Sequence, residues 1–130
     1  MSLQLSVFPN RYAICKISDP SDIPAWNPGF FLFGVIYSHN EITIICEESH
    51  VPSNAMVEYG WRLLEVVGSL DFNLVGILAG LTSALAKVNV SVFVLSTYRT
   101  DFIIVKEHDM RDAIIGLTAE GYKIDESCLG

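Results

Sequence analysis

The chain has 130 residues, a formal net charge of −7 and a pI of about 4.7. Hydrophobic residues make up 51% and charged residues 18%, against roughly 25% charged in a typical soluble domain. The eight lysines and arginines are spread along the chain, which excludes nucleic-acid binding as a predicted function because that needs clustered cations. So apolar a chain is expected to cover part of its surface with a partner, most simply as a homodimer.

The cysteines Cys15, Cys46 and Cys128 form no CxxC pair and no zinc-ligand spacing. We therefore predict free thiols in a reducing compartment, with no metal and no cofactor. The first residues contain no basic segment followed by an apolar run, so we expect no signal peptide. Charged residues interrupt the apolar stretch 63–95, so we expect no membrane span. These features together predict a cytoplasmic protein.

The first sixty residues predict strands and loops. Apolar residues alternate or cluster in residues 3–7, 12–17, 31–37 and 42–46, which predicts four strands. His39-Asn40 predicts a two-residue hairpin turn between the last two of these strands. The segments 18–29 and 47–60 predict loops, with a short helical turn after Pro52.

The second half begins with a predicted strand at 61–67 and a turn at 68–71. Apolar residues then recur every three or four positions from Leu74 to Val88, which predicts a helix of about 15 residues. Asp71 or Asn73 is expected to cap the helix N-terminus, and Asn89 to end the helix.

The order continues with strands at 90–96 and 102–105, joined by a turn at 97–100. Asp109 is expected to cap a second helix, which Gly121 ends before a short strand at 122–125. The order β-α-β-β-α-β is that of the ferredoxin-like fold, an α+β arrangement of a four-stranded antiparallel sheet with two helices on one face.

Five short patches follow one another on these elements: residues 41–46 (EITIIC), 60–62 (GWR), 68–72 (GSLDF), 76–78 (GIL) and 96–101 (STYRTD). As an ordered series, they resemble the small bacterial ACT-domain proteins related to the regulatory part of aspartate kinase. They are also similar to each half of an animal cytosolic arginine sensor. The resemblance spans residues 3–123 and implies tandem ferredoxin-like ACT-type modules, a degenerate one in 1–60 and a complete one in 61–130.

The resemblance further implies that a free amino acid is held where modules meet, near the first strand-to-helix turn. It implies a homodimer and a regulated protein partner, but it does not fix the amino acid; arginine is suggested only by the sensor. The expected function is therefore regulation without catalysis, and the sequence contains no recognisable set of nucleophile, base and orienting residue.

The residues themselves offer a matching chemistry. A helix N-terminus presents unpaired N–H groups and a partial positive charge, where a ligand carboxylate can bind. Gly76 has no Cβ, so a ligand can come close. Asp71 and Asp101 can receive an ammonium group, and nearby hydroxyls can donate to a carboxylate. The predicted ligand-binding residues are Ser69, Asp71, Phe72, Leu74, Gly76, Ile77, Ser96, Thr97, Thr100 and Asp101.

Structural alternatives remain open for these residues. Gly76 and Gly80 are four residues apart and can instead form a close helix-packing stripe. Asp71 can be a helix cap, and Asp101 an ordinary turn residue. A ligand-free interaction or oligomerisation module would explain the apolar composition equally well.

Overall fold

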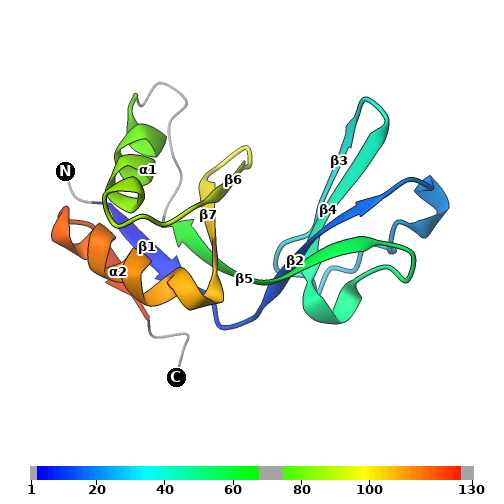
Figure 1. The fold of residues 1–130 in the computed structure, drawn as a ribbon, viewed down its shortest axis with the longest axis horizontal. Coiled ribbons are helices and arrows are strands. Elements are labelled where there is room, and N and C mark those ends of the chain that lie inside the picture. Colours follow the sequence, from blue (N-terminus) through cyan, green and yellow to red (C-terminus); the bar gives the residue numbers. More distant parts are fainter. Residues whose placement is uncertain (1–2, 68–74, 127–130) are drawn as a thin grey trace. The chain divides into compact units, whose positions relative to one another are not determined.

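The computed structural model describes residues 3–67 and 75–126. In chain order the elements are β1 (Gln4–Val7), β2 (Tyr12–Ile17), η1 (Pro20–Asp22), β3 (Gly34–Ser38), β4 (Glu41–Glu47), η2 (Glu48–His50), β5 (Met56–Val66), α1 (Ile77–Lys87), β6 (Phe93–Ser96), β7 (Asp101–Lys106), η3 (Glu107–Asp109), α2 (Met110–Ala119) and β8 (Lys123–Asp125) (Figure 1). The η elements are single 3-10 turns. The chain divides into two compact units: unit 1 is Met1–Pro9 with Arg62–Gly130, and unit 2 is Asn10–Trp61.

Unit 1 contains the predicted order β5-α1-β6-β7-α2-β8, so this part of the fold prediction is confirmed. Its strands lie in the order β8-β1-β5-β7-β6. The N-terminal strand β1 therefore lies between β5 and β8. The local sequence pattern did not predict this position of β1. β1 is antiparallel to β5, with Leu5 opposite Val66, and parallel to β8, with Leu5 opposite Ile124.

The core of unit 1 lies between one face of this sheet and both helices. Residues two positions apart on a strand point to the same face of the sheet. Each of the neighbouring strands β1, β5 and β7 contributes two such buried residues to this face: Leu5 and Val7, Leu64 and Val66, Ile103 and Val105. They pack in one cluster with the buried faces of the helices, which include Leu81 and Leu85 of α1 and Ala113 and Leu117 of α2. Both helices therefore cover the same face, as predicted.

The helix α1 is shorter than predicted. It begins at Ile77 and has 11 residues, because Gly76 adopts a φ of 84° and cannot continue a right-handed helix. Gly76 occupies the N-cap position without a side-chain hydrogen bond. Asp71 and Asn73, the predicted capping residues, lie outside the described residues. Asn89 ends the helix as predicted, with a left-handed φ of 62°.

Asp109 stands at the N-cap of α2, but its side chain makes no capping hydrogen bond.

Unit 2 is an antiparallel sheet in the order β3-β4-β2-β5. One cluster of its buried residues consists of Ala13, Cys15, Ile17, Ile42, Ile44 and Cys46. The predicted hairpin turn is confirmed: Ser38 pairs with Glu41, and Asn40 has a φ of 62°. Residues 10–61 are all described and contain no α-helix. The helical turn predicted after Pro52 lies before it, in η2.

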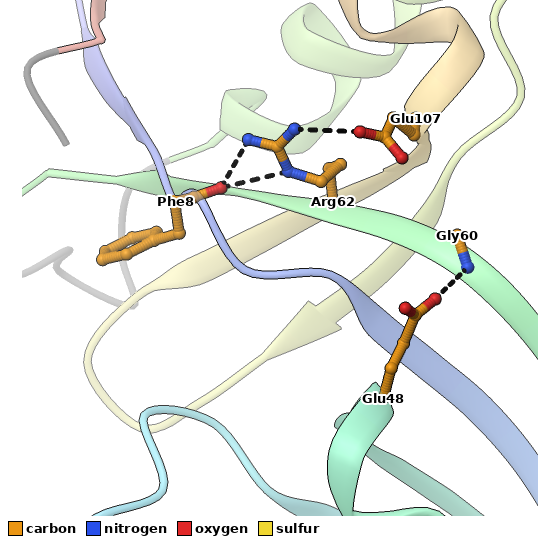
Figure 2. A network of polar contacts seen from close by, with 5 residues as sticks. All are labelled: Phe8, Glu48, Gly60, Arg62 and Glu107. Atoms are coloured by element: carbon orange, nitrogen blue, oxygen red, sulfur yellow. Dashed lines mark hydrogen bonds and ion pairs between the residues drawn. The ribbon is translucent and has the colours of Figure 1, made fainter. Parts of the chain in front are cut away.

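The strand β5 runs through the boundary between the units and begins at Met56, five residues before its predicted start at Trp61. A β-bulge interrupts the alternation of side chains, so the sequence pattern does not show where the strand begins. Tyr12 pairs with Trp61 but Ile14 pairs with Glu58, so β5 contains one extra residue. Gly60 in this bulge has a φ of 81°, and its N–H donates to Glu48 Oε2 at 2.7 Å (Figure 2).

Substitution of Gly60 by alanine is expected to lower the free energy of unfolding by about 1–2 kcal/mol, because a Cβ is unfavourable at this left-handed φ. Urea denaturation followed by circular dichroism measures the effect. Gly60→Asn is the control, since asparagine tolerates this φ better and should recover part of the loss. Equal losses in both variants would mean that φ is not the cause.

Candidate functional site

The predicted site divides between described residues and a segment outside them. Ser69, Asp71, Phe72 and Leu74 lie in residues 68–74, outside the described part of the chain. Their predicted roles stay predictions. The described members of the site are Gly76 and Ile77 at the start of α1, and Ser96, Thr97, Thr100 and Asp101 around the β6–β7 turn.

The space beside Gly76 at the start of α1 is open with respect to the described residues. Gly76 carries no side chain, and a Cβ added to it would meet no atom of the described chain within 4 Å. The carbonyl of Gly76 accepts the first helical hydrogen bond from the Gly80 N–H at 2.9 Å. The N–H groups of the first turn then have no helical acceptor. The Gly76–Gly80 packing alternative is therefore not supported at Gly76, whose glycine is required by φ rather than by a close neighbour.

Ile77 has a structural role. Its side chain is half-buried and packs against the core of unit 1. Ile77 anchors the first turn of α1 on the sheet, which fixes the direction of the first N–H groups.

Ser96 and Asp101 lie opposite each other where β6 and β7 meet the turn. The Ser96 hydroxyl donates to Asp101 Oδ1 at 2.5 Å, a short charge-assisted hydrogen bond. This bond orients the carboxylate and leaves further acceptor positions on it, because an ionised carboxylate accepts about four hydrogen bonds. Asp101 is half-buried, so it is accessible to a small cation.

The turn itself is held by its threonines. The Thr97 N–H donates to the Thr100 carbonyl at 2.8 Å, and the Thr97 hydroxyl lies 3.2 Å from the same oxygen. The Thr100 hydroxyl is buried and donates to the Val66 carbonyl at 2.7 Å. Thr100 therefore fixes the turn against the last residue of β5 instead of presenting its hydroxyl to a ligand.

This bond has a consequence for the predicted site. Val66 ends β5, and the chain then leads to the start of α1. The bond from Thr100 therefore places the β6–β7 turn at the end of β5 where the strand-to-helix connection begins.

Arg62 of unit 1 makes polar contacts that its place in the GWR patch does not predict. Its Nε and Nη2 donate to the Phe8 carbonyl at 3.2 and 2.8 Å, and its Nη1 lies 3.7 Å from Glu107 Oε1 (Figure 2). No local spacing links residues 8, 62 and 107, so only the fold could reveal this contact. Within residues 3–67 and 75–126, no group of three or more metal-ligating side chains is placed to hold a metal ion.

Residues 56–119 match the family model of the ACT domain. On its α+β, ferredoxin-like fold, this segment of the chain is thus similar to ACT domains.

Solved structures of other proteins have a similar fold. A protein of Agobacterium tumefaciens is 25% identical, with a TM-score of 0.85 over 95% of this chain and 92% of its own. A Vibrio cholerae protein of unknown function is 17% identical, with a TM-score of 0.71 over 92% of this chain and 90% of its own. The ligand-free regulatory subunit of aspartate kinase from Thermus thermophilus is 11% identical, with a TM-score of 0.62 over 90% of this chain and 96% of its own. The last two likenesses concern the fold alone. No helix in the described part of the chain has the length and apolarity needed to span a bilayer.

Proposed function

We propose that this chain is a non-catalytic regulatory module that binds a free amino acid between the start of α1 and the β6–β7 turn. The observation that carries the proposal is the oriented carboxylate of Asp101, on a turn that Thr100 ties to the end of β5. The ligand ammonium group would bind Asp101, and the ligand carboxylate would bind the N–H groups that follow Gly76. Ser69, Asp71, Phe72 and Leu74 remain proposed contributors.

Regulation would follow from a difference in affinity between two arrangements of the protein. A ligand that binds one arrangement more tightly shifts the population toward it, and a partner protein can respond to that shift. The proposal includes a homodimer in the cytoplasm, where Cys15 and Cys46 would remain thiols. The family's aspartate kinase relatives support a regulatory role.

A thermal-shift panel of the twenty amino acids tests this function. An amino acid present at 100 times its dissociation constant is expected to stabilise the protein by about 2.7 kcal/mol. Asp101→Asn should abolish the shift, because it removes the charge that receives the ammonium group. Asp112→Asn, on the exposed side of α2, is the matched control and should keep the shift. A flat panel at millimolar concentrations, with the wild type and both variants alike, would favour a ligand-free interaction module instead.

A further inference from the structure

A concave site lies in unit 1 beside α2. It is a groove of about 510 Å³, in the size range of small-molecule pockets. Met110, Ile114 and Ile115 of α2 give it an apolar surface. Arg62, Glu107, Arg111 and Glu126 add two cations and two anions to its lining.

The spacing along the chain arranges these groups. Glu107, Arg111 and Ile115 are four residues apart, so they follow one side of η3 and α2. Met110 and Ile114 form the neighbouring row, and Met110 is 8% exposed, so it belongs to the floor of the groove. Ile115 is 55% exposed, which leaves an aliphatic side chain at the rim without cover.

The charged residues of the groove differ in the contacts that they make within the protein. Arg62 is bound to the Phe8 carbonyl and lies beside Glu107. Arg111 and Glu126 are exposed, and neither has an ion pair or side-chain hydrogen bond to another residue in the described ranges. Arg111 can bind a carboxylate through two parallel N–H groups, and Glu126 can accept from an ammonium group.

We propose that this groove binds a second small zwitterion, an aliphatic α-amino acid. Its carboxylate binds Arg111, its ammonium group binds Glu126, and its side chain lies on Met110, Ile114 and Ile115. Within the described residues, the groove offers a cation (Arg111) and an anion (Glu126) that have no ion pair, and an apolar surface beside them. This site shares no residue with the proposed effector site at Gly76 and Asp101.

Isothermal titration of the full chain with leucine tests the proposal, with leucinamide and N-acetylleucine as probes that lack one charge each. Leucine is expected to bind, and each blocked analogue to bind at least tenfold more weakly. Arg111→Gln and Glu126→Gln should each weaken leucine binding about tenfold, the loss expected for one charge-assisted hydrogen bond. Both side chains are exposed, so the variants should fold. Lys16→Gln, an exposed cation of unit 2, is the matched control and should bind leucine like the wild type.

Two outcomes would overturn the proposal. One is the absence of leucine binding at millimolar concentration. The other is leucine binding that Asp101→Asn abolishes while Arg111→Gln and Glu126→Gln leave it unchanged, which would assign the ligand to the effector site. Conversely, binding lost in Arg111→Gln and kept in Asp101→Asn would support the groove even if the proposed effector site failed its own test.

Discussion

Substitution of Arg62 by methionine is expected to lower the free energy of unfolding by about 2–3 kcal/mol. The Arg62 side chain is only 11% exposed, and two of its nitrogens donate to the Phe8 carbonyl. Methionine keeps much of the volume but donates no hydrogen bond. It therefore leaves a partly buried carbonyl without its donor, at the point where the chain leaves β1 beside β5. Urea denaturation at neutral pH, followed by circular dichroism, measures the loss.

Two further variants separate the hydrogen bonds from the ion pair. Arg62→Lys retains the charge but replaces the two-nitrogen fork by one ammonium group, so an intermediate loss is expected. Glu107→Gln should cost below about 1 kcal/mol, because the Glu107 side chain is 40% exposed and its oxygen lies 3.7 Å from Arg62. If Glu107→Gln were as destabilising as Arg62→Met, the ion pair rather than the carbonyl contact would hold this region together.

The order of elements in the second half could be predicted because its signals are local. The apolar period of α1, the left-handed end at Asn89 and the β6–β7 turn each depend on neighbours in the sequence. The start of α1 was predicted too early, since an apolar residue at position 74 fits the helical period whereas only a structure gives the φ of Gly76. The pattern therefore located the helix but not its first residue.

The partners of β1 and the first half of β5 could not be predicted for a different reason. β1 joins unit 1 through pairing with β5 and β8, which are distant in the sequence. Pairing over such distances depends on the whole sheet and leaves no local periodicity. In β5, the extra residue at Gly60 moves later side chains to the other face, so the strand has no single alternation from Met56 to Val66.

In the candidate site, too, some contacts could be predicted from the sequence and others depend on tertiary packing. Ser96 and Asp101 were named from the sequence, and the structure pairs them across two strands. Thr100 was also named, but its hydroxyl is used within the fold by the Val66 carbonyl. A threonine in a turn carries the same sequence signal whether its hydroxyl faces solvent or a backbone carbonyl. Arg111 and Glu126 had no signal at all, because a groove between a helix and a strand end is made by tertiary packing.

Alkaline pH is expected to destabilise the protein through the buried thiols of unit 2. Cys15 on β2 and Cys46 on β4 are 2% and 1% exposed and lie on adjacent strands. Burial raises the pKa of the Cys46 thiol to about 12, with the neighbouring Cys15 adding to the effect, and burial also raises the pKa of Cys15. The folded chain thus keeps Cys46 protonated at a pH where the unfolded chain releases the proton.

The sign of the effect follows from this difference. The contribution of Cys46 is fully present below pH 9, the ordinary pKa of the thiol in the unfolded chain, and is lost as the pH rises toward 12. The loss for Cys46 alone is on the order of 1 kcal/mol at pH 10 and larger at pH 11. Urea denaturation in a reducing buffer from pH 8 to pH 11 measures it.

Two variants assign the loss to the thiol. Cys46→Ala lowers the free energy of unfolding at pH 8. The further decrease of this free energy between pH 8 and pH 11 should be smaller than in the wild type. Part of the fall should remain, because burial also raises the pKa of Cys15 and of Tyr12. Ile44→Val truncates the same core on β4 without removing a titrating group, so its stability should run parallel to that of the wild type at every pH. A Cys46→Ala curve that is also parallel to the wild type would show that the thiol does not carry the alkaline loss.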